Sequence, residues 1–118
     1  MKVIVTGGRT YLNKIQLFET LDAIMRSENK IDVLIQGGAS GADSLAMCWA
    51  NTRNVECKTY WAQWDKFGKE AGRKRNRLML FENQDAVVIA FKGGRGTGHC
   101  VEMAKSLNMK VILIKDTV

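Results

Sequence analysis

Short runs of apolar residues alternate along the chain with longer stretches in which apolar residues recur with the period of a helix. Because the short runs are continuously apolar, they predict parallel strands that are buried on both faces. These runs lie at residues 3–5, 31–35, 55–61, 86–91 and 111–114. The helical stripes between them are Phe18, Leu21 and Met25; Ala42, Leu45, Ala46 and Trp49; Leu78 and Phe81, after a basic stretch that starts near Lys69; and Val101, Ala104 and Leu107.

The alternation of strand and helix runs through the whole chain, without proline and without a Ser/Gly-rich linker. It predicts a single α/β domain over residues 1–118, with a doubly wound, mainly parallel five-stranded sheet and right-handed crossovers. Such sheets bind ligands outside the carboxyl ends of their strands, near the point where the strand order reverses. Site residues are therefore expected in the strand-to-helix loops.

The composition is that of an ordinary globular domain, with 46% apolar and 25% charged residues. No apolar run is long enough to span a bilayer, and the N-terminus lacks the apolar core of a signal peptide. The three cysteines have neither disulfide-framework nor metal-ligand spacing. We expect a cytoplasmic protein with reduced thiols, no membrane partner, no metal and no cofactor.

The net charge of +6 favours anionic partners such as nucleotides, nucleic acid or phosphorylated metabolites. Much of the positive charge is concentrated in residues 66–77. Lys69, Arg73 and Arg77 share one helical stripe there, for which a solvated face is the expected environment.

Most of the 11 glycines lie in three segments, each directly after a predicted strand and before a predicted helix. Glycine lets a backbone approach a phosphate closely, and a helix N-terminus supplies free N–H groups. Any one strand-to-helix turn uses glycine for its own geometry, but three at one sheet edge predict a phosphate- or nucleotide-binding pocket. The segments are Gly7-Gly8, Gly37-Gly38 with Gly41, and Gly93-Gly94 with Gly96 and Gly98. None is a Walker A or a G-x-G-x-x-G motif, which argues against an ATPase and a dehydrogenase.

These motifs, in this order, resemble the small stand-alone proteins of the SLOG superfamily that are related to YspA. The resemblance covers essentially the whole chain and rests on residues 7–11, 37–43, Trp64, Gly68, 71–72, Arg75, Asn76, Met79 and 91–97. It implies a Rossmann-like fold, assembly into dimers or larger oligomers, and a nucleotide-derived ligand. That ligand is expected to be ADP-ribose-like, NAD-like or a cyclic nucleotide signal, and several such proteins are thought to act in bacterial or phage conflict systems.

The superfamily also includes the LOG-type phosphoribohydrolases, whose Pro-Gly-Gly-x-Gly-Thr motif is followed within three residues by a glutamate. Here Lys92 takes the proline position, and the nearest acid after Thr97 is Glu102. Cleavage of an N-glycosidic bond needs a carboxylate within reach of the reacting atoms. We therefore expect binding without turnover or with slow turnover, and no catalytic residue. Phosphoribohydrolase activity on a nucleoside monophosphate is the first alternative.

Nucleic-acid binding in the manner of DprA, another member of the superfamily, is the second alternative. The basic segment 66–77 would carry it, but this segment lacks the interleaved exposed aromatics that favour single-strand binding. Nucleic acid is therefore not the expected partner. We expect a small nucleotide-like ligand and a homo-oligomer.

The residues predicted to bind the ligand come from the three glycine segments and from the segment after the third strand. They are Gly7, Gly8, Arg9, Tyr11, Gly37, Gly38, Ala39, Gly41, Asp43, Trp64, Arg75, Asn76, Gly93, Gly94, Gly96 and Thr97. Arg75 and Asn76 are included through the resemblance. A core or subunit contact is expected for Tyr60 and Trp61, and a base-stacking role for Trp64.

Several candidates also have a purely structural interpretation. Asp43 follows Ser40 at the spacing of a capping box, so it either caps a helix or contacts a ribose hydroxyl. Thr97 opens the last predicted helix, as its N-cap or as a donor to phosphate. Arg9 is a surface residue or a ligand contact, whereas a solvated position is expected for Arg95 and a surface or capping position for His99.

Overall fold

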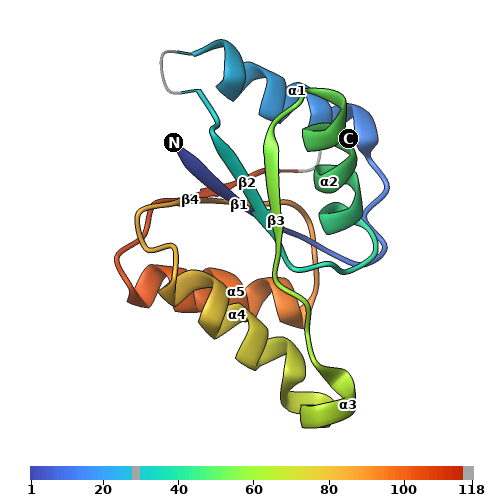
Figure 1. The fold of residues 1–118 in the computed structure, drawn as a ribbon, viewed down its shortest axis with the longest axis vertical. Helices are drawn as coiled ribbons and strands as arrows, with labels where there is room; N and C mark the ends of the chain where they lie inside the picture. Colours follow the sequence, from blue (N-terminus) through green and yellow to red (C-terminus); the bar gives the residue numbers. More distant parts are fainter. Residues whose placement is uncertain (28–29, 116–118) are drawn as a thin grey trace.

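The centre of the molecule is a sheet of five parallel strands in the order β3-β2-β1-β4-β5. The computed structural model describes residues 1–27 and 30–115. The strands are β1 (Lys2–Thr6), β2 (Val33–Gln36), β3 (Glu56–Thr59), β4 (Val87–Ala90) and β5 (Val111–Leu113). The predicted doubly wound, Rossmann-like α/β sheet is confirmed (Figure 1).

Helices cover both faces of the sheet, as a doubly wound fold requires. The helical elements are α1 (Lys14–Arg26), α2 (Ala42–Thr52), α3 (Trp64–Phe67), the short 3₁₀ helix η1 (Gly68–Glu70), α4 (Ala71–Phe81) and α5 (Arg95–Ser106). In Figure 1, α1 and α2 lie on one side of the sheet, and α4 and α5 lie on the other. Within the described residues, no helix is long and apolar enough to cross a membrane.

The central strands supply side chains to an apolar cluster on each face, which is why they are continuously apolar in sequence. Val3 and Val5 of β1 point into the cluster with Leu21 and Trp49, whereas Ile4 belongs to the opposite cluster with Leu80. The chain continues outward from β1 through β2 to β3 and then returns to place β4 on the other side of β1. The strand order therefore reverses between β1 and β4, which is where such folds bind ligands.

Two expectations about burial are wrong. The third and fifth strands are expected to be buried, but β3 and β5 are the edge strands of the sheet. The residues of β3 alternate between exposed and half-buried, and in β5 two residues are half-buried and Leu113 is 58% exposed. In α4, Leu78 and Phe81 are each 52% exposed, and the buried residues are Ala71, Asn76, Met79 and Leu80. The apolar stripe assumed from the sequence therefore lies off the buried face, because α4 also buries a polar side chain toward the site. Self-association through such exposed apolar residues stays a prediction.

Candidate ligand-binding site

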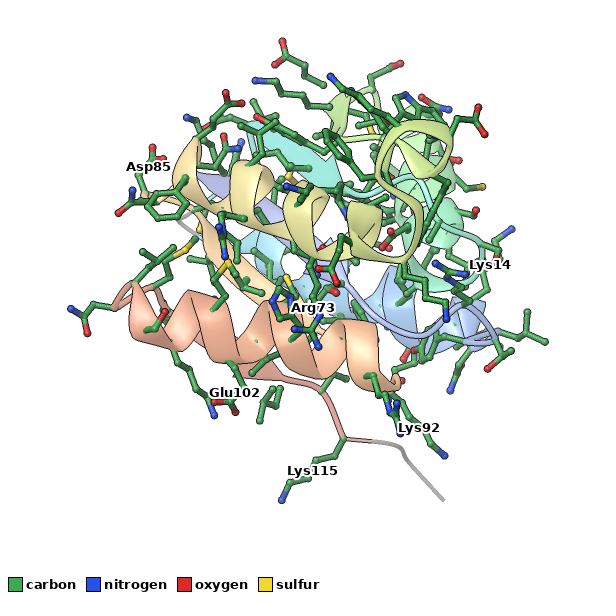
Figure 2. The ribbon with its side chains drawn as sticks, turned by 90° about the horizontal axis from the view of Figure 1, so that it is seen from below. Lys14, Arg73, Asp85, Lys92, Glu102 and Lys115 are labelled. Carbon is green, nitrogen blue, oxygen red and sulfur yellow. The ribbon has the colours of Figure 1, made fainter. Side chains whose placement is uncertain are left out.

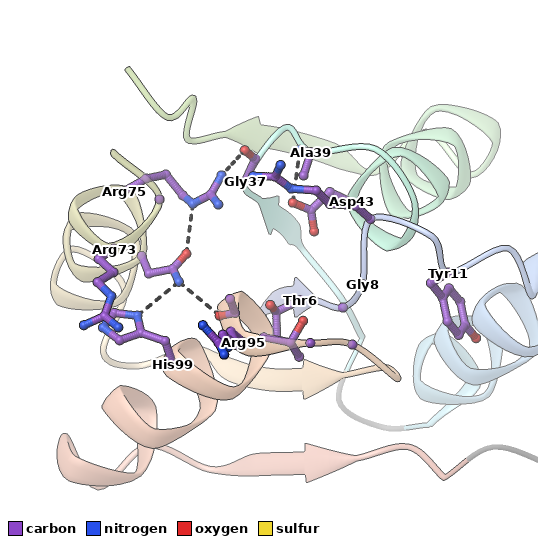
Figure 3. A pocket seen from close by; sticks show the side chains of 18 of the residues that line it. Thr6, Gly8, Tyr11, Gly37, Ala39, Asp43, Arg73, Arg75, Arg95 and His99 are labelled. Atoms are coloured by element: carbon purple, nitrogen blue, oxygen red, sulfur yellow. Dashed lines mark hydrogen bonds between the residues drawn. The ribbon is translucent and has the colours of Figure 1, made fainter. Parts of the chain in front are cut away.

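A cavity of about 750 Å³ opens at the carboxyl ends of the strands, where the strand order reverses. All three glycine segments contribute to its wall, as the sequence predicted. The predicted residues that line it are Gly7, Gly8, Arg9, Tyr11, Gly37, Ala39, Asp43, Trp64, Arg75, Asn76, Gly93, Gly94, Gly96 and Thr97. In Figure 3, Asp43 and Gly8 face Arg73, Arg75 and His99 across the cavity. Gly38 and Gly41 lie outside this lining.

Several glycines are required because the loops pack backbone against backbone. The N–H of Gly8 donates to the carbonyl of Lys92 at 2.8 Å, and a Cβ on Gly8 would lie 3.0 Å from that oxygen. A Cβ on Gly93 would lie 2.7 Å from the nitrogen of Gly8. Gly41 has a φ of +79°, and a side chain there would collide with the carbonyl of Gly8. These glycines hold the three loops together, so for them the structural interpretation is sufficient.

Gly94 and Gly96 are different, because the fold has no need of them. Both line the cavity, yet a Cβ on either would meet no atom within 4 Å. Gly96 lies within the first turn of α5, where glycine costs about 1 kcal/mol relative to alanine. Gly94 is the N-cap of α5 and offers no side-chain acceptor to the N–H groups of the first turn. The missing side chains leave space in front of a helix N-terminus, a favourable environment for an anion.

Helices α2 and α5 begin at other residues than the sequence predicts. Gly94 caps α5, so the helix begins at Arg95 and Thr97 is not the N-cap. Gly41 caps α2, so Ser40 and Asp43 do not form a capping box. The hydroxyl of Ser40 instead donates to the carbonyl of Arg9 at 3.2 Å, which ties the first loop to the second. In α2 the neighbouring backbone leaves no room for a side chain at the cap residue Gly41. In α5 a side chain at the cap residue Gly94 would meet no neighbouring atom.

Asp43 places a buried carboxylate in the cavity wall. It is 6% exposed and accepts a hydrogen bond from the N–H of Ala39 at 3.2 Å. Burial raises the pKa of Asp43 from 3.8 to about 6, against the opposing effects of that hydrogen bond and of the positive charges of Arg75 and Arg9. Asp43 is therefore mostly ionised at neutral pH. Among the described residues that line the cavity, it is the only one with a carboxylate.

The remaining charge around the cavity is positive. It comes from Arg9, Lys69, Arg73, Arg75, Lys92 and Arg95. Lys69, Arg73 and Arg95 are exposed, as expected for a solvated face, and they also line the cavity. Figure 2 shows Arg73 between α4 and α5. Several cations around one carboxylate favour an anionic ligand.

Helix α4 connects the second and third glycine loops through a chain of hydrogen bonds. The guanidinium of Arg75 donates to the carbonyl of Gly37, and its Nε donates to Oδ1 of Asn76 at 2.9 Å. Asn76 Nδ2 in turn donates to the carbonyl of Gly96 at 3.4 Å and lies 3.3 Å from Nδ1 of His99. These bonds hold the side chains of Arg75 and Asn76 on the face of α4 that lines the cavity (Figure 3).

His99 is partly exposed and lines the cavity, and it does not cap α5, because Gly94 takes that position. Burial lowers the pKa of His99, and the nearby charges of Arg73 and Arg77 lower it further. The imidazole is therefore neutral at neutral pH. With Nδ1 accepting from Asn76, the proton resides on Nε2, which makes that atom a donor.

The aromatic residues divide between core and site. Tyr60 is buried and its hydroxyl donates to Glu82 at 2.7 Å, so its expected structural role is confirmed. Tyr11 lines the cavity, but its ring lies 5.3 Å from that of Phe91 and its hydroxyl donates to Gln16. Trp61 does not lie in the core, because its side chain is 66% exposed, and the other expectation for it, a subunit contact, stays a prediction.

A model of the YspA, cpYpsA-related SLOG family matches residues 1–67. The chain belongs to this family. The resemblance inferred from the glycine motifs is thereby confirmed. This SLOG protein is 35% identical over 123 residues to the Gene 61 protein of Mycobacterium phage D29, an alignment that covers 98% of this chain and 97% of that protein.

The fold of the chain is similar to that in the X-ray structure of DNA processing protein A (DprA) from Streptococcus pneumoniae. The TM-score is 0.76 at 19% identity, over 99% of this chain and 51% of that one. The chain thus spans about half the length of DprA. The matched residues 1–67 include the first two glycine loops, whereas α4, the third loop and α5 follow them.

The sequence missed a part of this SLOG cavity. The residues not predicted are Val5, Thr6, Thr10, Lys69, Gly72, Arg73, Met79, Lys92, Arg95 and His99. Gly72 and Met79 were available as signals, because both belong to the motifs that carry the resemblance. His99 had no signal of its own, since its position depends on how α4 and α5 pack.

Proposed function

We propose that this SLOG protein binds a small nucleotide-derived anion in the cavity and senses or sequesters it. The observation that carries the proposal is the pair Gly94 and Gly96, which the fold does not require and which keep the N-terminus of α5 open to the cavity. Membership of the SLOG family and the DprA-like fold support a nucleotide- or nucleic-acid-related role. Similarity to a phage protein supports a place in a conflict between phage and bacterium.

The charges of the cavity suggest how the ligand lies. A phosphate group fits in front of α5, where Gly94 and Gly96 leave space and Lys92 and Arg95 add positive charge. Asp43, on the opposite wall, accepts hydrogen bonds and suits the hydroxyl groups of a sugar. A phosphorylated sugar, as found in nucleotides and ADP-ribose, offers both groups.

Replacing Gly96 by alanine tests the proposal. The added methyl group would narrow the space in front of α5, so we expect binding to weaken about tenfold or more. Stability should rise by up to about 1 kcal/mol, because alanine is the better helix former. The measurement is the amount of small molecule released per protein after heat denaturation, identified by mass spectrometry, together with thermal unfolding.

Gly98→Ala is the matched control. Gly98 is in the same helix, a Cβ there also meets no atom within 4 Å, and it is not among the described residues that line the cavity. This variant should gain stability and keep wild-type binding. Equal binding by the Gly96 and Gly98 variants would contradict a ligand at the start of α5.

A second prediction is that the ligand is released chemically unchanged. Glu102 lies on the side of α5 that faces away from α4 (Figure 2), and the described cavity lining does not include it. We expect Glu102→Gln to keep ligand affinity within a few-fold of the wild type. The measurement is release of free base or ribose 5-phosphate from nucleoside monophosphates, by chromatography. Release at an ordinary enzymatic rate, stopped by Glu102→Gln, would favour the phosphoribohydrolase alternative.

A further inference from the structure

A second hollow of about 360 Å³ adjoins the cavity on the side of β3 and α3. Trp61 and Trp64 line it, opposite the loop after β2. The hollow and the cavity lie side by side, because both are lined by Arg9, Gly37, Ala39, Trp64 and Arg75. Both volumes fall in or near the range of about 300 to 1,000 Å³ that is typical of small-molecule sites.

The indole rings of Trp61 and Trp64 each pack against a glycine, and the rest of each side chain is exposed. A Cβ on Gly38 would lie 2.5 Å from the ring of Trp61, and a Cβ on Gly72 would lie 3.4 Å from the ring of Trp64. The side chains of Trp61 and Trp64 are nevertheless 66% and 46% exposed. Neither ring belongs to an apolar core cluster of the described chain. The core therefore does not explain either ring, whereas a planar ligand group stacked on them would.

Two guanidinium groups lie where the hollow meets the cavity. The guanidinium of Arg9 is 5.1 Å from the ring centroid of Trp64. Arg75 is held by the carbonyl of Gly37 and by Asn76. Arg9 and Arg75 thus lie between an aromatic hollow and a polar cavity. This arrangement suits a ligand whose phosphate lies between a base and other polar groups.

We propose that the hollow formed by Trp61 and Trp64 is a stacking subsite for the nucleobase of the ligand. The phosphate then lies near Arg9 and Arg75, and the remaining sugar and phosphate groups occupy the main cavity. This inference rests on the proposed function and deepens it, because it makes the ligand a nucleotide with an intact base rather than a sugar phosphate. Stacking tolerates different bases, since each has an aromatic face.

The experiment compares two probes on two variants. ADP-ribose carries a base, whereas ribose 5-phosphate lacks one. Trp61 lines only the hollow, so Trp61→Ala should weaken ADP-ribose binding about five- to a hundredfold and change ribose 5-phosphate binding less than twofold. Phe67→Ala is the control, because Phe67 is a partly exposed aromatic of α3 that lines neither space within the described chain. It should leave both affinities unchanged.

Tryptophan fluorescence supplies a readout that a structural defect does not imitate. ADP-ribose should quench the exposed indoles of the wild type, and ribose 5-phosphate should not. Trp61→Phe should keep most of the affinity for ADP-ribose, because phenylalanine also stacks. This variant shows that a loss in Trp61→Ala does not arise from misfolding.

The possible outcomes separate the two proposals. If ADP-ribose binds and Trp61→Ala has no effect, or weakens both probes equally, the stacking subsite is overturned while the cavity proposal stands. If neither probe binds the wild type at millimolar concentration, the nucleotide proposal for the cavity is overturned, and the subsite with it. If a single-stranded oligonucleotide binds more tightly than ADP-ribose and depends on Trp61, the indoles serve nucleic acid and the subsite proposal is wrong.

Discussion

Replacing Gly94 by aspartate is expected to abolish ligand binding and to leave the domain folded. A Cβ at this position meets no atom within 4 Å, so the side chain has space. The carboxylate would lie at the start of α5, where the anionic group of the ligand is proposed to bind. Repulsion between unit charges about 4 Å apart is about 4 kcal/mol at an effective dielectric constant near 20. This corresponds to roughly a thousandfold loss of affinity.

Calorimetric titration with ADP-ribose measures the effect, and circular dichroism checks the fold. Gly98→Asp is the matched control, because it adds the same charge to the first turns of α5 at a position outside the described cavity lining. It should retain binding within a few-fold of the wild type. A Gly94 variant that is folded and binds normally would remove the start of α5 from the site.

Replacing Asp43 by asparagine is expected to stabilise the protein above pH 6. Burial raises the pKa of Asp43 from 3.8 to about 6, so the folded protein binds the proton more tightly than the unfolded chain does. Stability from this group is therefore highest below the unfolded pKa and falls as the pH rises through about 6. The stability contributed by this group differs by about 3 kcal/mol between pH values below 3.8 and above 6, and about 1.4 kcal/mol of that is lost between pH 5 and pH 8. Asparagine does not ionise, and its Oδ1 still accepts from the N–H of Ala39.

Urea unfolding at pH 5 and pH 8 measures this effect as the difference between the variant and the wild type. The variant should be more stable at pH 8, and its advantage should shrink at pH 5. Asp85→Asn is the control, because Asp85 is an exposed carboxylate in a surface ion pair with Lys2, whose loss changes stability by about 1 kcal/mol or less. Equal stability of the Asp43 variant and the wild type at pH 8 would show that the ionised, buried carboxylate does not lower the free energy of unfolding.

The position of the site was predictable because it follows from chain order alone. A glycine loop comes after each of β1, β2 and β4, and the carboxyl ends of parallel strands meet at one edge of the sheet. Gly7, Gly37 and Gly93 therefore had to come together once the strands were assigned correctly. The same sequence did not distinguish the glycines that pack the loops from those that leave space. That distinction depends on the atoms that a side chain would meet, as Gly93 and Gly94 show.

The sequence by itself determined the alternation of strands and helices, the family motifs and the sheet edge at which the site lies. These properties are local: apolar periodicity, glycine after a strand and motif order are all present before the chain folds. Only the tertiary structure decided that β3 is an edge strand, that Arg73 and His99 line the cavity, and that Trp61 is exposed beside it. The edge position of β3 depends on the strand order, and the other two depend on how α3, α4 and α5 pack. Residues far apart in the chain jointly determine both.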